Sequence, residues 1–265
     1  MGMNLEADKT STAVATLGKP ASIRAQTANL RAYWLGWGGE IGTDLPVYRS
    51  GLRHPLLNGV LRVQHQSAEA ALAEAGRRLA GVPYVWWVGP DSRPGLADEL
   101  VALGANRMSR LPLMAVDLAR VPAEEPPPGL TIRQVTSRAD LIDYADVCAE
   151  AFAIPDDQIG GFVEAEAADR SAYSYNVRFV GRVAGRAVAT SALSISHGVA
   201  GIYWVATRAE HRGRGIGRAV TTAALLAGRE RGLRIGTLQA SGLGEPVYRR
   251  IGFQTVGHCE HLSPA

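Results

Sequence analysis

The spacing of apolar positions in the second half of the chain predicts strands and helices in a definite order. Apolar runs bounded by Gly or Pro favour strands, and apolar residues three or four positions apart favour helices. The predicted strands lie at 130–135, 175–180, 184–195, 201–207 and 234–241, with a turn at Gly181-Arg182. The predicted helices lie at 138–151, where Ser137 is the cap, at 156–169, at 215–231 and just before Gly252. With closing strands, the predicted order from residue 130 is β-α-α-β-β-β-α-β-α-β.

The first half shows a weaker version of one part of this pattern. Val85–Val88 is an apolar run, a helix is predicted at 96–103, and a strand follows at 112–118. Because the same strand–helix–strand order ends the chain, we predict an internal repeat; an unrelated small α/β domain is the alternative. Four prolines and two glutamates mark a stiff linker between the halves. The predicted division is a domain at 1–120, a linker at 121–129 and a domain at 130–265.

Composition narrows the function mainly by exclusion. The chain carries 28 Lys and Arg against 25 Asp and Glu, a balance too even for a dedicated nucleic-acid binder. Cys148 and Cys259 lack metal-ligand spacing, so we expect reduced, buried thiols and no metal. Residues 1–29 are polar and hold no continuous apolar stretch, which argues against a signal peptide or a membrane span. We therefore expect a soluble cytoplasmic protein that binds neither nucleic acid nor membrane.

The candidate chemistry begins in a glycine-rich segment between a predicted strand and a predicted helix. It reads Arg212-Gly213-Arg214-Gly215-Ile216-Gly217 and is followed by Arg218. Glycines leave backbone N–H groups uncovered at a helix N-terminus, the helix dipole favours an anion there, and arginines add donors suited to phosphate. The spacing fits neither a P-loop nor the dinucleotide fingerprint, because Arg218 stands where the last glycine belongs. The segment predicts a site for another phosphorylated cofactor, the alternative being a turn that only caps a buried helix.

Two motifs together resemble the GNAT superfamily of N-acetyltransferases. Residues 212–217 are similar to the family's diphosphate loop, Gln/Arg-x-x-Gly-x-Gly/Ala, and Tyr248-Arg249-Arg250-Ile251-Gly252-Phe253 is similar to a second family motif. The resemblance covers about residues 129–260. It implies an α/β fold of GNAT type, with a central mixed sheet flanked by helices, duplicated here with a degenerate N-terminal copy. It also implies transfer of an acetyl group from acetyl-CoA to a primary amine of a small molecule, and it is compatible with a homodimer.

The resemblance also implies roles for individual residues. Those that would hold the diphosphate are Arg212, Gly213, Arg214, Gly215, Ile216, Gly217 and Arg218. The segment Val205, Ala206, Thr207 would pair with the pantetheine arm and present a backbone N–H to the thioester oxygen. Gly201 would tolerate a β-bulge that opens a gap beside the next strand. Tyr248 would donate a proton to the departing thiolate, its alternative role being packing, and Ser241 is either a cofactor contact or a strand-end cap.

No general base is evident in the predicted strand at 201–207. The candidates are His197, Glu164 and Glu166, beside a water chain or an amine that arrives neutral, while His211 is expected to support cofactor binding. Two other functions stay open: a coenzyme A-binding regulatory or structural module, and another acyl-coenzyme A reaction such as a decarboxylation. The tryptophans of the first half are expected to pack in a core or to line a shared acceptor cleft; they are Trp34, Trp37, Trp86 and Trp87.

Overall fold

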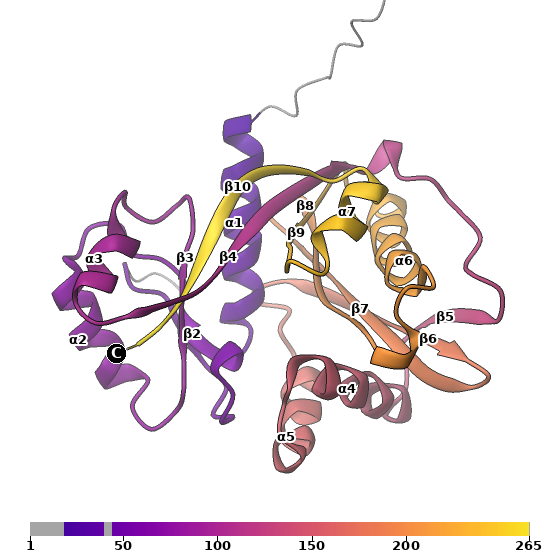
Figure 1. Ribbon diagram of the computed structural model, residues 1–265, viewed down its shortest axis with the longest axis horizontal. Helices are drawn as coiled ribbons and strands as arrows, with labels where there is room; N and C mark the ends of the chain where they lie inside the picture. Colours follow the sequence, from indigo (N-terminus) through magenta and orange to yellow (C-terminus); the bar gives the residue numbers. More distant parts are fainter. Residues whose placement is uncertain (1–18, 40–43, 265) are drawn as a thin grey trace, which may run out of the picture.

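The computed structural model describes residues 19–39 and 44–264, so that residues 1–18 of the polar segment 1–29 lie outside the described residues. One mixed sheet runs through both halves, in the order β1-β2-β3-β10-β4-β9-β8-β7-β6-β5 (Figure 1). Its strands are β1 (Val47–Arg49), β2 (Asn58–Val60), β3 (Val85–Val88), β4 (Asn106–Asp117), β5 (Leu130–Gln134), β6 (Tyr175–Val183), β7 (Arg186–Ser196), β8 (Val199–Thr207), β9 (Ile235–Gln239) and β10 (Gln254–Ser263). The helices are α1 (Lys19–Leu35), α2 (Ala68–Arg78), α3 (Leu96–Ala102), α4 (Arg138–Phe152), α5 (Asp156–Ala167), α6 (Ile216–Glu230) and α7 (Glu245–Ile251).

The element order predicted from residue 130 onward is confirmed, with one wrong turn. β6 and β7 join at Ala184-Gly185, not at Gly181-Arg182, and both turn residues have positive φ, 49° and 80°. Two successive left-handed residues give the hairpin turn whose twist matches the flanking strands. Gly181 lies inside β6 instead, where a Cβ would approach Val220 Cγ1 of α6 to 3.0 Å. The glycine therefore serves close packing of a helix on the sheet, which a sequence cannot distinguish from a turn.

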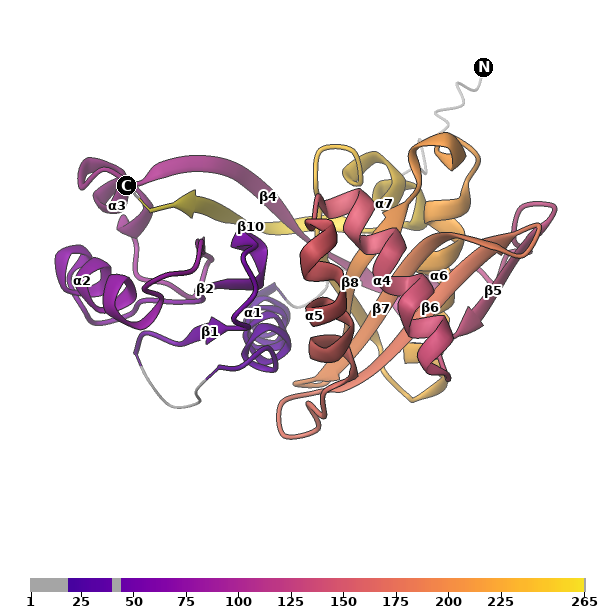
Figure 2. The same cartoon turned by 90° about the horizontal axis from the view of Figure 1, so that it is seen from below.

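Helices cover both faces of the sheet in the second half. α4 and α5 lie in front of β6, β7 and β8 in Figure 2, and α6 lies behind them. The inward face of α6 is buried and carries Val220, Ala224 and Ala227. At Gly228 the helix comes so close that a Cβ would lie 2.9 Å from Ala200 Cβ of β8. Small residues thus hold α6, and the loop before it, tightly against β8.

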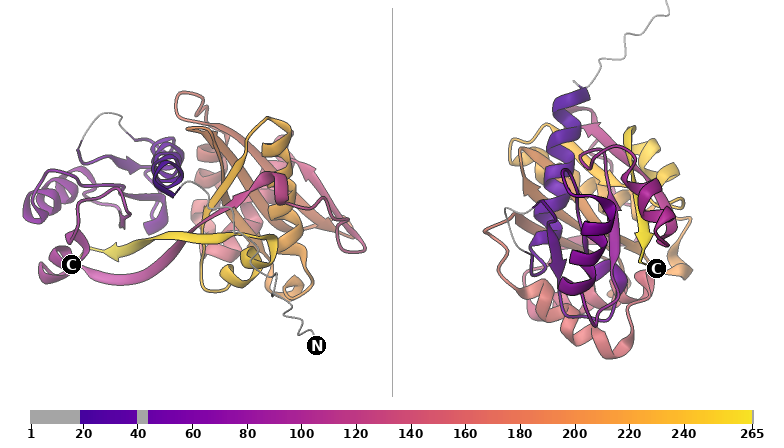
Figure 3. Two further views of the ribbon diagram at one scale, coloured as in Figure 1. Left: turned by 90° about the horizontal axis from the view of Figure 1, so that it is seen from above. Right: turned by 90° about the vertical axis from the view of Figure 1, so that its left-hand side faces the viewer.

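The two halves are joined through the centre of the sheet. β4 of the first half pairs with β9, β10 of the second half pairs with β3, and β4 and β10 pair with each other. Figure 3 shows that β10 brings the C-terminus beside α3. The units β3–α3–β4 and β9–α7–β10 therefore make matching contacts across the β4–β10 pair. A duplication, and the division into domains at 1–120 and 130–265, stay predictions.

Helix α1 was not predicted from the sequence, which showed only that residues 1–29 are polar and hold no continuous apolar stretch. It stands between the halves in Figure 1 and contacts β1 and β7 to β10. Two of its buried polar side chains bond to the sheet. Asn29 donates to Ser194 O at 3.1 Å and accepts from Tyr203 Oη at 2.8 Å. Gln26 Oε1 accepts from Thr237 Oγ1, also at 2.8 Å. These polar residues are hydrogen-bond partners of the sheet, so their polarity does not indicate exposure.

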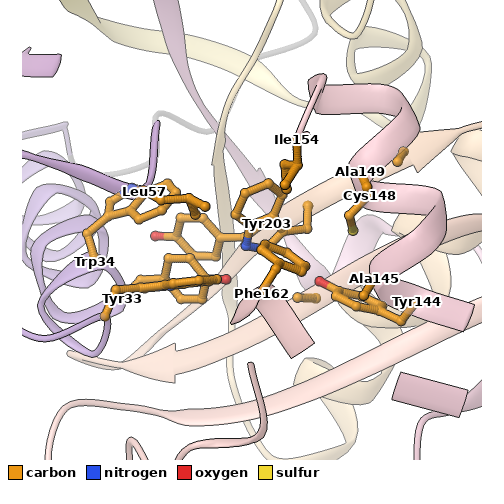
Figure 4. Packing of buried hydrophobic residues seen from close by; sticks show 14 of the residues in the cluster. Tyr33, Trp34, Leu57, Tyr144, Ala145, Cys148, Ala149, Ile154, Phe162 and Tyr203 are labelled. Carbon is orange, nitrogen blue, oxygen red and sulfur yellow. The ribbon is translucent and has the colours of Figure 1, made fainter. Parts of the chain in front are cut away.

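An aromatic cluster fills the space where the halves meet. Tyr33 of α1 stacks on Tyr203 of β8 with ring centroids 3.8 Å apart, and Trp34 lies in the same cluster with Phe162 of α5 (Figure 4). Trp37 and Trp87 belong to this cluster, whereas Trp86 packs with α2 and α3 in the core of the first half. Core packing, one of the two roles expected for these tryptophans, thus describes their observed surroundings.

Candidate functional site

The neighbouring strands β8 and β9 separate at the centre of the second half. Their pairing is limited to Ala200 with Gly236 and Gly201 with Thr237. From Ile202 onward, the edge of β8 that faces β9 has no strand partner among the described residues, although the strand continues to Thr207. An unpaired strand edge offers backbone donors and acceptors to any extended ligand that lies beside it. The predicted segment Val205, Ala206, Thr207 lies in this part of β8.

β8 also carries a bulge, but not where the sequence placed it. Trp204 and Val205 together oppose the single residue Ser191 of β7, and Trp204 has a φ of 48°. The expected position, Gly201, lies in regular pairing, and a Cβ there would come within 2.0 Å of Asn29 Oδ1. Gly201 is therefore required for the approach of α1. A bulge next to a separated strand redirects the following backbone groups.

The glycine-rich segment forms the connection from β8 to α6. A short 3₁₀ turn (Ala209–His211) follows β8, and Gly213 and Gly215 then adopt φ values of 75° and 77°. Gly215 is the N-cap of α6 and makes no side-chain capping bond. The first amides of α6 are therefore not occupied by a cap, and the dipole of a 15-residue helix points its positive end at them.

Arginines surround this helix end with different partners. Arg212 Nε donates to Thr207 O at 3.0 Å, which holds its stem against β8. Arg218 pairs with Glu124 of the linker at 2.6 Å, and both side chains are about half exposed. Arg208 is bound to Glu150 of α4 and to Ala187 O. Among the described residues, Arg214 makes no ion pair or hydrogen bond, so its guanidinium remains available for an anion.

Tyr248 lies on α7, with its ring packed between neighbours. Its residue is 8% exposed, and the ring belongs to the apolar cluster that Val205 borders. A Cβ on Gly244 would lie 2.7 Å from the ring, and Phe253 meets the ring at 5.9 Å between centroids. Burial raises the pKa of Tyr248 to about 12. Among the described residues, nothing hydrogen-bonds to the phenol, which is therefore a protonated donor without an internal acceptor.

Ser241 follows β9 in an exposed turn. Its Oγ accepts a hydrogen bond from the backbone N–H of Gly244 at 3.2 Å. This bond fixes the turn that leads into α7, and it matches the capping alternative of the two roles expected for Ser241. Contact with a cofactor stays a prediction.

The three candidate bases lie in unlike surroundings. Glu164 is exposed and paired with Arg138 on the surface. Glu166 is 1% exposed and lies between Arg178, at 2.5 Å, and Arg170, at 3.8 Å. His197 stands in the turn before β8, at the opposite end of the strand from Thr207, and the nine residues of β8 alone span roughly 26 Å at about 3.3 Å per residue. Burial, and secondarily Arg31, lowers the pKa of His197.

A cavity of about 380 Å³ opens beside Arg208, and no motif in the sequence pointed to it. Its polar lining is mostly acidic, with Asp146 and Glu150 one helical turn apart on α4 and Asp156 at the start of α5. Ala149, Ile154 and Ile159 complete it. The i, i+4 spacing of two carboxylates was visible in the sequence. The sequence did not show that these carboxylates line a cavity, because Arg208 comes next to them only when the chain folds.

The comparison with protein families decides the identity of the second half. Residues 131–256 match the family described as "Acetyltransferase (GNAT) domain". Residues 131–256 are a GNAT acetyltransferase domain. This confirms the family inferred from the glycine loop and the tyrosine motif, and GNAT enzymes take their acyl group from acetyl-CoA. Among curated proteins, no sequence matches this chain.

Solved structures agree with the GNAT fold over nearly the whole chain. A GCN5-related N-acetyltransferase from Kribbella flavida is 22% identical, with a TM-score of 0.69, over 94% of this chain and 96% of that one. A functionally unknown conserved protein from Staphylococcus epidermidis is 17% identical, with a TM-score of 0.62, over 86% and 94%. A tandem GNAT protein from the clavulanic acid biosynthesis pathway is 17% identical, with a TM-score of 0.57, over 83% and 77%. The predicted mixed α/β fold is thereby confirmed.

The described residues contain neither a candidate membrane span nor a candidate metal site. No helix among them has both the length and the apolar character needed to cross a bilayer. Within residues 19–39 and 44–264, no three His, Cys, Asp or Glu side chains are grouped so that they could hold a metal ion.

Proposed function

We propose that this GNAT enzyme transfers an acetyl group from acetyl-CoA to a primary amine of a small molecule, in the gap between β8 and β9. One observation carries the proposal: the unpaired edge of β8 runs directly into the glycine loop at the N-terminus of α6. A cofactor with a diphosphate at one end and an amide-bearing arm at the other fits this arrangement. Its phosphates would bind the amides of residues 213–218 and the side chain of Arg214, and its arm would pair with Val205–Thr207.

Chemistry would take place where the arm passes the bulge of β8. The amine nitrogen forms a bond to the thioester carbon, while a backbone N–H at Val205 stabilises the developing oxyanion. The C–S bond then breaks and the sulfur leaves with its electron pair. Tyr248 donates its proton to that sulfur, for which a phenol kept neutral by burial is suited. Water takes the proton lost by the amine, and Tyr248 recovers a proton from solvent.

The acidic cavity beside Arg208 supports a cationic acceptor. Three carboxylates and one arginine line the cavity; the carboxylates belong to Asp146, Glu150 and Asp156. The electrostatic potential in the cavity therefore favours a protonated amine. Helices α4 and α5, which form the cavity, lie on the face opposite α6 and its glycine loop (Figure 2). Donor and acceptor would therefore reach the gap from opposite faces of the sheet. The acceptor would lose its proton to water on entering.

A second candidate is a coenzyme A-binding module that does not transfer. It is favoured by the positions of the three candidate bases, because Glu166 is held by two arginines and His197 lies at the far end of β8. The available phenol of Tyr248 favours transfer. An acceptor screen that follows thiol release from acetyl-CoA separates the two, since the module would bind coenzyme A and release no thiol with any amine.

The cofactor loop is tested separately by calorimetry with acetyl-CoA. Gly215→Val places a side chain where the diphosphate would lie, and we expect affinity to fall roughly tenfold or more as phosphate hydrogen bonds are lost. Gly232→Val is the matched control, because Gly232 has a similar φ of 82°, open surroundings and a position past the other end of α6. Unchanged affinity in a folded Gly215→Val protein would exclude the loop as the diphosphate site.

A further inference from the structure

Trp204 has a backbone conformation that its neighbours must enforce. Four non-glycine residues in the described ranges have positive φ. Ala184 and His197 lie in hairpin turns and Ala153 caps α4, where such values are common, but Trp204 lies inside a strand. The left-handed region is unfavourable for a bulky side chain, and such strain persists only where the surroundings over-determine it. The contacts of Trp204 must therefore stabilise this conformation.

Aromatic rings from both halves of the chain surround the Trp204 indole. Phe152 and Phe162, from α4 and α5, meet it edge-on with centroids 4.7 and 5.1 Å away. Trp37 and Trp34, from the first half, lie at 5.9 and 6.0 Å. The Trp204 residue is only 6% exposed, so the rings form a closed cage. Half of this cage is supplied by residues outside the GNAT domain at 131–256.

A buried hydroxyl on the neighbouring strand bonds to the Trp204 backbone. Thr190 on β7 donates from Oγ1 to the carbonyl of Trp204 at 2.8 Å, and Thr190 is fully buried. Cys148 Sγ lies 3.5 Å from the same hydroxyl. The bond spans the bulge, because Thr190 pairs in register with Ala206 rather than with Trp204. It therefore ties the left-handed residue to the regular part of the ladder.

We propose that Thr190, Trp34 and Trp37 are positioning residues that keep the β8 bulge in the shape required for acyl transfer. The inference rests on the proposed function, in which the backbone N–H after Trp204 meets the thioester oxygen. If Trp204 relaxed to an extended conformation, the peptide between Trp204 and Val205 would rotate, and that N–H would leave its place. The first half of the chain thus contributes to catalysis by holding a residue of the second half, without touching the substrate.

The test compares three substitutions at two adjacent residues of β7. Thr190→Val keeps the shape of the side chain and removes the hydroxyl; Thr190→Ser restores it. Ser191→Ala is the matched control, because Ser191 Oγ donates a buried bond of 2.7 Å to Val220 O on the opposite face. We expect Thr190→Val to lower kcat by roughly tenfold to hundredfold, as small misplacements of catalytic groups do, with the Kd for coenzyme A unchanged. Thr190→Ser should recover most of kcat, and Ser191→Ala should keep it.

A second arm tests the contribution of the first half. Trp37→Phe shrinks the cage, whereas Trp86→Phe makes the same change in a core that does not contact Trp204. We expect only Trp37→Phe to lower kcat at unchanged coenzyme A affinity. Hydrogen exchange of the peptide covering 203–207 should accelerate about tenfold or more in Thr190→Val and Trp37→Phe, and not in either control.

The outcomes separate this inference from the proposed function. The positioning role is overturned if Thr190→Val retains full kcat, if Ser191→Ala loses as much as Thr190→Val, or if exchange at 203–207 is the same in all variants. The exchange measurement needs no turnover. If the wild type releases no thiol, the transfer reaction is refuted. If exchange at 203–207 is nevertheless faster only in Thr190→Val and Trp37→Phe, the role of these residues in holding the bulge is upheld.

Discussion

Tyr248 is the single residue on which the proposed chemistry depends most. Because burial raises its pKa to about 12, the phenol stays protonated at every pH at which the protein is handled. We expect Tyr248→Phe to lower kcat on the order of 10²-fold or more, since the departing thiolate loses its proton donor while the packed ring remains. Steady-state kinetics and calorimetry check this together, because the Kd for acetyl-CoA should not change.

The raised pKa of Tyr248 also predicts the pH dependence of the rate. In the wild type, the rate should show no descending limb from this group below about pH 10, because its ionisation lies near 12. Tyr175→Phe, at an exposed tyrosine, is the control and should leave both kcat and the pH profile unchanged. Turnover at the parental rate in Tyr248→Phe would mean that the residue only packs and that the thiolate leaves unaided.

His261 makes stability depend on pH. Burial lowers the pKa of His261 from 6.5 to about 4, and its ring lies edge-on against Trp87 at 3.9 Å between centroids. The unfolded chain takes up this proton below pH 6.5 and the folded chain only near pH 4, so stability is lost as the pH falls between these values. The loss should approach about 3 kcal/mol. Urea unfolding between pH 4 and 7 should show that His261→Phe flattens this slope.

The matched control for that experiment is the exposed His258, three residues earlier on the same strand. His258→Gln should leave the pH dependence of unfolding as it is in the wild type. If His261→Phe retains the full acid sensitivity of the parent, burial of this imidazole is not its cause.

At the scale of elements, the linker between the halves runs along α6 to the cofactor loop. Its start is held by Arg229 near the C-terminal end of α6, which donates to Val121 O at 2.9 Å. Its middle is held by the Glu124–Arg218 pair, and Pro127 Cγ lies 3.6 Å from where a Cβ on Gly215 would be. The carboxylate of Glu124 is thus paired with an arginine beside the proposed diphosphate site.

We expect Glu124→Gln to raise the affinity for acetyl-CoA. Removing the carboxylate frees Arg218 for phosphate, and the gain should be up to about fivefold, the size of an exposed ion pair, and smaller at high salt. Glu125→Gln is the control, since Glu125 has no ion pair among the described residues and carries the same charge. Equal gains in both variants would point to net charge rather than to this contact.

At the scale of the whole molecule, the second half is not expected to stand alone. A fragment covering 130–265 lacks β4, so β9 and β10 lose their common partner, and it lacks the first-half side of the aromatic cluster. Exposed strand edges and apolar rings favour association. We expect the fragment to aggregate or to be inactive, whereas a full chain cut within Pro126–Pro128 should stay together and active. A soluble, monomeric, fully active fragment would show that the first half is dispensable.

The sequence by itself determined the features that depend on neighbours along the chain. The order of ten elements from residue 130 follows from local periodicity, and the loop 212–217 follows from glycines whose positive φ is a property of their own backbone. Neither the periodicity nor the glycine conformation depends on where the segment lies in the folded protein. The tyrosine motif followed in the same way, because the spacing from Tyr248 to Phe253 lies within a single helix and its cap.

The tertiary structure alone decided what depends on partners far apart in sequence. Asn29 is buried against hydrogen-bond partners that lie more than 160 residues away along the chain. No residue near Asn29 in the sequence indicates this burial. The bulge lies at Trp204, where rings from three helices pack around the indole. It does not lie at Gly201, where α1 approaches the strand closely. Pairing of β10 with β3 and β4 likewise joins the halves through long-range hydrogen bonds. Local patterns report which segments form helices and strands, but the free energy that selects their contacts comes from burial, which exists only once the chain has folded.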